Sequence, residues 1–293
     1  MHTRTVALAQ IAPKLGDVRA NLARHLEWIE RARAAGADLA VFPELSLTGY
    51  DLQDLVPEVA IPVDGEVLGR LTAASRGIDI VAGFVEEDPG HKFYNAAAYL
   101  AGGTVAHVHR KLHLPTYGLF QEGREFSVGE TLRAFPTAHG STGLLLCEDL
   151  WHSPTTWLLA QQGADLVVVA ANAPSRGAHP DHGPTSASVW RDLLKVTARF
   201  HTVYLVCVNR VGCEDGLSFD GGSTVVDPTG VIVAELPLLD EALECVELPA
   251  DLLRTARTAS PLLRDARIEL VHREVARLRR IRFDLPDEPE AER

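Results

Sequence analysis

A cysteine directly follows a short apolar run in Gly143-Leu144-Leu145-Leu146-Cys147-Glu148-Asp149-Leu150-Trp151-His152. The apolar run predicts a buried strand, and the acids after Cys147 predict the beginning of a helix. A thiol at such a strand-to-helix turn is exposed to a pocket, and a helix N-terminus favours the thiolate. Cys147 is therefore a candidate nucleophile, and a buried strand-end cysteine is the alternative.

Strand-like and helix-like segments alternate on both sides of this stretch. Apolar runs predict strands over 5–11, 38–45, 78–86, 142–147, 165–171 and 204–208. Helical spacing of apolar residues predicts helices over 17–35, 64–76, 155–162 and 186–200. Two hairpins are predicted, one joining 94–100 to 104–109 and one joining 223–227 to 231–235. This mixture of strand–helix units and hairpins predicts an α/β protein with mixed sheets.

One domain is predicted over residues 1–282. No repeat, Gly/Ser linker or break in composition interrupts this range, and its last helix is expected over 265–281. Residues 283–293 are acidic and contain prolines, so we expect a disordered tail there.

Composition excludes several classes of protein. The chain has 293 residues and a formal net charge of −12, which argues against general nucleic-acid binding because phosphates are held by clustered Lys and Arg. No apolar stretch reaches the roughly 20 residues of a membrane helix, and no signal peptide begins the chain. We therefore expect a cytoplasmic protein with no membrane partner.

No metal or cofactor is predicted. The four cysteines form no CxxC pair, there is no HExxH pattern, and no GxGxxG element follows a strand. His107, His109 and His113 lie close together in sequence, but we expect them to line a surface or to orient neighbouring groups.

Two further segments carry candidate reactive groups. Glu44 ends the apolar run of Val41-Phe42-Pro43-Glu44-Leu45-Ser46-Leu47-Thr48-Gly49-Tyr50. Lys111 stands in the basic cluster of His109-Arg110-Lys111-Leu112-His113-Leu114-Pro115-Thr116-Tyr117-Gly118. Ligands of open α/β sheets gather at the carboxyl ends of strands. Taken singly, Glu44 fits an ordinary exposed strand-end residue, and the basic cluster fits a solvated face.

Together the three segments resemble the nitrilase superfamily of carbon–nitrogen hydrolases, whose signature is a Glu–Lys–Cys triad in that chain order. Phe42-Pro43-Glu44 is similar to the glutamate motif of the family, and Arg110-Lys111 followed by His113-Leu114 is similar to its lysine motif. Leu146-Cys147-Glu148-Asp149 is similar to its cysteine motif. The resemblance extends from the first strand to about Val246.

The resemblance implies roles for these residues. Cys147 would be the nucleophile of an acyl transfer through a thioester, Glu44 its base and Lys111 the partner of the oxyanion. The family often adds a second glutamate soon after the lysine. Glu122 is the better match for it, and Glu125 is the competitor.

The same resemblance implies a nitrilase-like α-β-β-α four-layer sandwich, with two mixed sheets flanked by helices. Subunits of the family commonly pair through helices, so a homodimer or a higher homo-oligomer is expected. The contact elements would be the helix after Cys147, the helix over 186–200 and the C-terminal segment.

A narrower resemblance is to the glutaminase domain of glutamine-dependent NAD synthetase. The segments that carry it are 43–50, 114–118, 147–151, 208–212 and 219–223. The synthetase domain itself has no counterpart in these residues. The resemblance implies that Tyr117 and Glu148 contact the amino-acid end of a glutamine-like substrate, and that Ser175 and Arg176 contact its carboxylate.

Several functions stay open at this point. The favoured one is an independent amidase for a small amide, with glutamine preferred. The second is an ammonia-supplying subunit for a separate synthetase chain, and the third is a hydrolase of a nitrile or a carbamoyl amine. Glu148 stands where nitrile-cleaving members typically have Trp, which argues against a nitrile. A non-catalytic binding protein is disfavoured because Glu44, Lys111 and Cys147 are all present.

Overall fold

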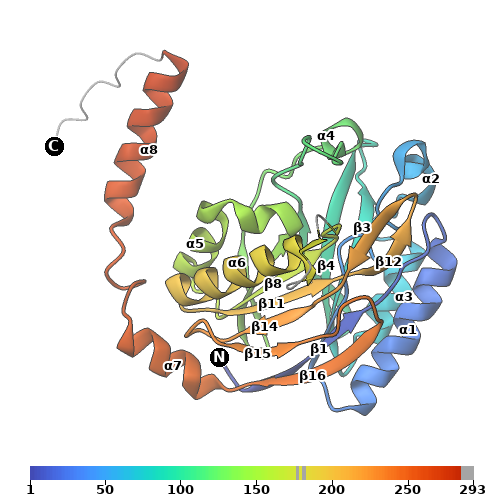
Figure 1. Cartoon of the computed structure of the whole chain (residues 1–293), viewed down its shortest axis with the longest axis horizontal. Helices are drawn as coiled ribbons and strands as arrows, with labels where there is room; N and C mark the ends of the chain where they lie inside the picture. Colours follow the sequence, from blue (N-terminus) through green and yellow to red (C-terminus); the bar gives the residue numbers. More distant parts are fainter. Residues whose placement is uncertain (176–177, 180–182, 285–293) are drawn as a thin grey trace.

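Two six-stranded sheets pack face to face and carry helices on their outer surfaces, as Figure 1 shows for the computed structural model. The structure describes residues 1–175, 178–179 and 183–284. The four layers form the α-β-β-α sandwich that the family resemblance implies, so the predicted α/β class with two mixed sheets is confirmed.

The first sheet has the strand order β16-β1-β2-β3-β4-β5. Its strands are β1 (Arg4–Gln10), β2 (Leu39–Val41), β3 (Asp79–Glu87), β4 (Phe93–Ala101), β5 (Thr104–Arg110) and β16 (Ala242–Leu248). β1, β2 and β3 are parallel, whereas β4 is antiparallel to both β3 and β5. β5 therefore runs in the same direction as β2, and their carboxyl ends lie at one edge of the sheet.

The second sheet has the order β15-β14-β11-β8-β7-β6. Its strands are β6 (Ala134–Thr137), β7 (Gly140–Leu146), β8 (Leu166–Ala171), β11 (Tyr204–Asn209), β14 (Thr224–Val226) and β15 (Ile232–Glu235). The central strands β7, β8 and β11 are parallel, and the outer strands are antiparallel to their neighbours. The carboxyl ends of β7 and β8 consequently lie side by side.

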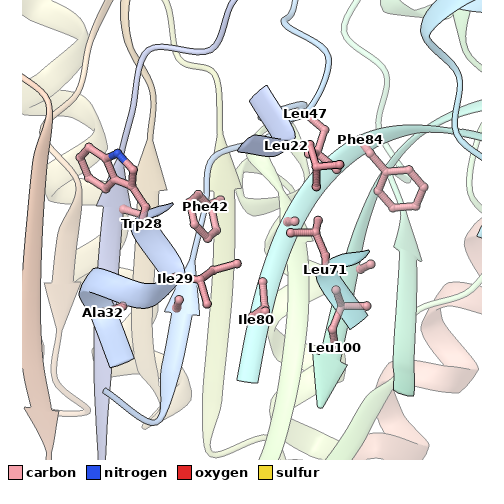
Figure 2. Close-up of a cluster of buried hydrophobic side chains, with 14 of the residues drawn as sticks. Leu22, Trp28, Ile29, Ala32, Phe42, Leu47, Leu71, Ile80, Phe84 and Leu100 are labelled. Carbon is pink, nitrogen blue, oxygen red and sulfur yellow. The ribbon is translucent and has the colours of Figure 1, made fainter. Parts of the chain in front are cut away.

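Helices α1 (Val18–Ala34) and α3 (Glu66–Ala74) cover the first sheet, and α5 (Ser153–Gln161) and α6 (Thr185–His201) cover the second. α1 begins where the Asp17 side chain accepts a hydrogen bond from the backbone N–H of Ala20. Its apolar face, with Leu22 and Ile29, packs against Phe42 and its neighbours on the sheet (Figure 2). This burial stabilises the outer layer.

Alternation along β8 separates two further parts of the core. Leu166, Val168 and Ala170 lie between the two sheets, whereas Val167, Val169 and Ala171 face α5 and α6. The strand is buried on both faces, which is why its sequence is a continuous apolar run.

Two predicted strands end earlier than expected. The strand predicted over 38–45 stops at Val41, because Pro43 has no N–H for the ladder and Leu45 takes a positive φ of 45°. The strand predicted over 142–147 stops at Leu146, since Cys147 has a φ of 40° and begins a 3-10 helix. Both reactive residues thus stand in sharp turns and not in strands.

The remaining short elements line the loops. They are η1 (Gln53–Leu55), α2 (Val56–Val59), α4 (Glu122–Glu125), η2 (Cys147–Trp151), β9 (Ala178–His179), β10 (Gly183–Pro184), β12 (Val211–Glu214) and β13 (Leu217–Asp220).

The C-terminal part consists of α7 (Ala250–Ala259) and α8 (Ile268–Phe283). α8 extends away from the two sheets (Figure 1), and no residue of this described helix is buried. It ends one residue beyond the predicted domain boundary at 282. Residues 285–293 of the predicted tail lie outside the described residues, and the division into domain and tail stays a prediction. None of the described helices is long and apolar enough to cross a membrane.

Candidate active site

The site lies where the carboxyl ends of strands from both sheets meet. Glu44 stands three residues after β2, and Lys111 directly follows β5. Cys147 directly follows β7, and Asn172 directly follows the adjacent strand β8. The parallel directions of these strands within each sheet bring segments that are far apart in sequence to one edge.

Lys111 lies between two buried carboxylates. Its Nζ donates hydrogen bonds of 2.7 Å to Oε1 of Glu44 and of 2.7 Å to Oε1 of Glu122. The Glu44 carboxylate is held on two sides, because Asn95 Nδ2 donates to Oε1 at 2.8 Å and the backbone N–H of Asn172 donates to Oε2 at 2.9 Å. The side chains of Glu44 and Lys111 are 0% and 1% exposed, so their positions are closely determined.

The second glutamate next to Lys111 is Glu122 and not Glu125. Glu122 Oε1 also accepts a hydrogen bond of 2.8 Å from the Tyr50 hydroxyl. The Glu125 carboxyl lies instead among other carboxylates, and burial together with Asp51 raises its pKa. The geometry therefore favours Glu122 for the position that the sequence left open between the two.

Burial and charge act against each other at Lys111 and Glu122. Burial alone would lower the pKa of Lys111, but Glu122 and Glu44 raise it well above its usual value. Burial and the nearby Glu44 raise the pKa of Glu122 despite the opposing effect of Lys111. Because one cation serves two buried carboxylates, Glu122 keeps a proton to higher pH than an exposed glutamate does.

The pKa of the Cys147 thiol is raised in the folded protein. Burial and the negative charge of Glu44 raise the pKa of Cys147 well above its usual value, although Lys111 opposes them. This shift runs opposite to the stabilisation of the thiolate that the sequence suggested for a helix N-terminus. Burial is the largest of the causes that raise this pKa. A thiol in this state needs a base before it can act as a nucleophile.

Asp149 connects the lysine segment to the cysteine turn. Its Oδ1 accepts hydrogen bonds from the backbone N–H groups of Leu112 at 3.0 Å and His113 at 2.9 Å. Its Oδ2 accepts from the ring Nε2 of His109 at 2.9 Å and from the backbone N–H of Leu146 at 3.2 Å. Burial opposes the ionisation of Asp149, but the hydrogen bonds from the two histidines lower its pKa. Asp149 thus fixes the segment that follows Lys111 against the residue that precedes Cys147.

The residues predicted to bind substrate are only partly brought together. The Tyr117 hydroxyl donates to Glu148 at 3.0 Å, and the Tyr117 side chain is 53% exposed, so this pair lies at the surface beside the nucleophile. Ser175 donates instead to the Asp220 carboxylate. Arg176 lies outside the described residues.

A cavity of about 670 Å³ borders Glu122. Within the described part of the chain, its lining includes Glu122 and Tyr50 and leaves out Cys147. Its walls are acidic, with a single arginine among the charged residues: Asp51, Asp54, Glu122, Arg124, Glu125 and Asp215.

Four contributing residues were not among the predicted site residues. Tyr50 and Asp149 stand inside segments that were quoted for Glu44 and Cys147, but nothing in their spacing indicated a partner. Asn95 left a signal, because it is a polar residue in a strand that is otherwise apolar up to Ala101. Asn172 contacts Glu44 through its backbone N–H, and every residue except proline has this group, so the residue type does not reveal the contact.

Among residues 1–175, 178–179 and 183–284, no group of three or more His, Cys, Asp or Glu side chains is placed to hold a metal ion.

Comparison with known proteins identifies the class. The sequence profile of the carbon-nitrogen hydrolase family matches residues 5–258, and the chain belongs to this family, within the nitrilase superfamily. A glutamine-dependent NAD(+) synthetase of Thermotoga maritima is 34% identical over 256 residues, which cover 86% of this chain and 43% of the synthetase. The chain thus spans less than half the length of that relative.

Two amidases match over nearly their whole length. An (R)-stereoselective amidase of Pseudomonas sp. is 35% identical over 269 residues, which cover 90% of this chain and 92% of the amidase. A mutant of the amidase from Nesterenkonia sp. AN1, solved after Michael addition of acrylamide at its active site cysteine, superimposes with a TM-score of 0.78. It is 28% identical, and the match covers 92% of this chain and 99% of that one.

Proposed function

We propose that this chain is a cysteine-dependent amidohydrolase that cleaves a small-molecule amide, with glutamine-like amides favoured, into ammonia and a carboxylic acid. The observation that carries the proposal is the buried array in which Lys111 Nζ bridges Glu44 and Glu122, near enough to Cys147 for the charges of all three to shift the pKa of its thiol. Buried ionic groups of this kind stabilise a fold weakly, and a reactive role accounts for them better.

The first half of the proposed reaction forms a thioester. Glu44 takes the proton of the Cys147 thiol as Sγ attacks the amide carbon, and the carbonyl oxygen becomes an oxyanion. Lys111 and the backbone N–H of Glu148 stabilise that oxyanion. Glu44 then returns the proton to the nitrogen, the C–N bond breaks, and ammonia leaves.

The second half releases the acid. Glu44 takes a proton from water, the hydroxide attacks the thioester carbon, and the C–S bond breaks with return of the proton to Cys147. Glu122 and Asn95 keep Lys111 and Glu44 in place through both halves. This sharing of roles requires a protonated resting thiol, in line with the raised pKa of Cys147.

A second candidate is an ammonia-supplying subunit whose synthetase partner is a separate chain. The similarity to 43% of an NAD synthetase favours it, whereas the match to 92% of an amidase favours an independent enzyme. A carbamoyl amine or a nitrile is the remaining alternative substrate.

The test is ammonia release from glutamine, asparagine, propionamide and propionitrile by wild type and Cys147→Ala, side by side. Release from an amide that disappears in the variant supports the proposal. Release that persists in Cys147→Ala, or release from the nitrile alone, contradicts it. Release only after a synthetase chain is added selects the partner-dependent subunit.

We also infer a homodimer that forms through the layer of α5 and α6. This layer exposes large apolar side chains, with Leu158 41%, Val196 53% and Phe200 62% exposed. Such a patch on an outer helix layer marks an interaction surface. Light scattering of wild type and Val196→Asp/Phe200→Asp tests this inference, with a dimer expected for wild type and a monomer for the variant.

A further inference from the structure

The side chain of Asn172 is buried beside the reactive groups and has no partner. Asn172 is 1% exposed, and neither its Oδ1 nor its Nδ2 has a hydrogen-bond partner among the described residues. Its backbone N–H is committed to Glu44 Oε2. A buried primary amide without hydrogen bonds is destabilising, so its presence at this position calls for a function.

The direction of this side chain follows from the alternation of β8. Val168 and Ala170, two and four residues earlier, lie between the sheets, where Glu44 approaches from the first sheet. Continuation of the strand period by one more step places the Asn172 side chain on this same face. A hydrogen bond from the Asn172 backbone is also among the causes that lower the pKa of Cys147, so Asn172 lies close to the nucleophile.

Asn209 offers an internal comparison. It ends β11, the strand next to β8, and is paired in register with Ala171. Its side chain is fully used within the protein, because Oδ1 accepts from the backbone N–H of Ala173 at 2.9 Å and Nδ2 donates to Gly221 O at 2.9 Å. The two asparagines at neighbouring strand ends therefore differ in their side-chain hydrogen bonds. The Asn209 amide is bonded within the fold, whereas the Asn172 amide has no partner among the described residues.

Other unpartnered atoms gather at the same place. Asn95 Oδ1 and Glu122 Oε2 are buried without a partner in the part of the chain that the structure describes. Their residues contact Glu44 and Lys111, respectively. Together with Asn172 Oδ1, these are three buried oxygens around Glu44 and Lys111. Acceptors in this number suit a group rich in N–H donors.

We propose that Asn172 is a specificity-determining residue whose side-chain Oδ1 accepts an N–H of the reacting carboxamide, so that the site selects amides over esters. The inference rests on the proposed amidohydrolase function and adds to it the group that recognises the leaving nitrogen. An ester of the same acid has no N–H at that position, and Oδ1 then gains nothing from it. A site that pairs with a substrate N–H discriminates strongly against an analogue that lacks it.

The experiment compares each amide of the panel with its methyl ester: glutamine with glutamate γ-methyl ester, asparagine with aspartate β-methyl ester, and propionamide with methyl propionate. The variants are Asn172→Leu and Asn172→Ala, both of which keep the backbone N–H to Glu44. Asn209→Leu is the matched control. For the Asn172 variants, kcat/KM should fall about 10- to 100-fold for the amide and stay within about threefold for the ester.

Stability gives a second readout that separates recognition from support of the fold. Removal of an unpartnered amide should leave the melting temperature of the free Asn172 variants unchanged or raised. Asn209→Leu should lower it and should change amide and ester rates by the same factor. Equal loss on amide and ester in the Asn172 variants, or no loss on either, overturns the inference. If wild type hydrolyses none of the amides, the proposed function itself fails, which is seen without any variant of Asn172.

Discussion

The two halves of the site are built differently. On the side of the first sheet, Glu44, Lys111 and Glu122 are tied together by hydrogen bonds of 2.7 Å. On the side of the second sheet, Asn172 presents a buried side-chain amide that has no partner within residues 1–175, 178–179 and 183–284. The first-sheet groups are held by the protein before any substrate arrives, whereas the proposed role of Asn172 needs a substrate to engage its side chain. The segments around Lys111 are thus preorganised by hydrogen bonds, and the segment at Asn172 keeps side-chain groups that no described residue engages.

Removal of the cation should have the largest effect. In Lys111→Met, ammonia release should fall by about 1,000-fold or more, because the oxyanion loses its charged partner. The free energy of unfolding should fall by about 3 to 5 kcal/mol, because two buried carboxylates lose their shared cation. Rate assays and urea denaturation measure both effects.

The double variant Lys111→Met/Glu122→Gln is the control for that change. It removes one of the unpaired carboxylates, so it should regain part of the stability and none of the activity. A Lys111→Met protein as stable and active as wild type would show that the first half of the site is not preorganised by charge.

Substitution of the two glutamates of α4 should affect kcat differently, because only Glu122 is hydrogen-bonded to Lys111. Glu122→Gln should reduce kcat about 100-fold, since Lys111 loses one of its two carboxylate partners. Glu125→Gln changes the same atoms three residues away, in a position without a hydrogen bond to Lys111, and should keep kcat within about twofold. Steady-state rates of the two purified variants decide the assignment, and a larger loss in Glu125→Gln would reverse it.

Asp149→Asn tests the connection between the two halves. Both oxygens of Asp149 accept hydrogen bonds from N–H groups, so in either orientation the NH2 of the new asparagine faces N–H donors. The free energy of unfolding should therefore fall by about 2 to 3 kcal/mol at pH 7. Since the pKa of Asp149 is lowered in the folded protein, its ionisation stabilises the fold above the unfolded pKa of about 3.9.

That stabilisation is lost as the pH falls below this value. Denaturation of wild type and Asp149→Asn between pH 7 and pH 3 should therefore show a stability difference that is largest near neutral pH and shrinks below about pH 4. A difference that is independent of pH would mean that the charge of Asp149 does not matter to the connection.

The smallest effect is expected at the surface. The Tyr117 hydroxyl is bonded to Glu148 and its ring is exposed, so Tyr117→Phe frees the carboxylate without disturbing the core. For glutamine, KM should change about threefold to tenfold with kcat nearly constant, as expected when only ground-state binding is affected. A loss confined to kcat would mean that Tyr117 acts in the reaction itself and not in substrate binding.

The sequence was most informative where residue type and element period agree. The apolar runs before Glu44 and Cys147 predicted buried strands, and the two-sheet sandwich followed from their motifs. The exact strand ends were missed because they depend on Pro43 and on the positive φ of Cys147. These are local backbone effects, and the pattern of apolar residues along the chain does not reveal them. β16 was missed for another reason: it is a partly exposed edge strand that carries acids among its apolar residues.

The site shows the same limit. Glu44, Lys111 and Cys147 stood out through their motifs, but the side chains that hold them come from segments that no spacing relates. Asn95 reaches Glu44 across 51 positions and Asn172 across 128. Contacts of this range depend on sheet order, which the strand pattern alone does not determine.

The most direct test of the central claim is the mass of the peptide that contains Cys147, after acid quenching during turnover of an amide hydrolysed in the panel. A Cys147 that passes through a thioester should carry an added acyl group, which neutral hydroxylamine removes and which Cys147→Ala never acquires. Ammonia release at the wild-type rate from Cys147→Ala, with no acyl group on Cys147 in the wild type, would contradict the account.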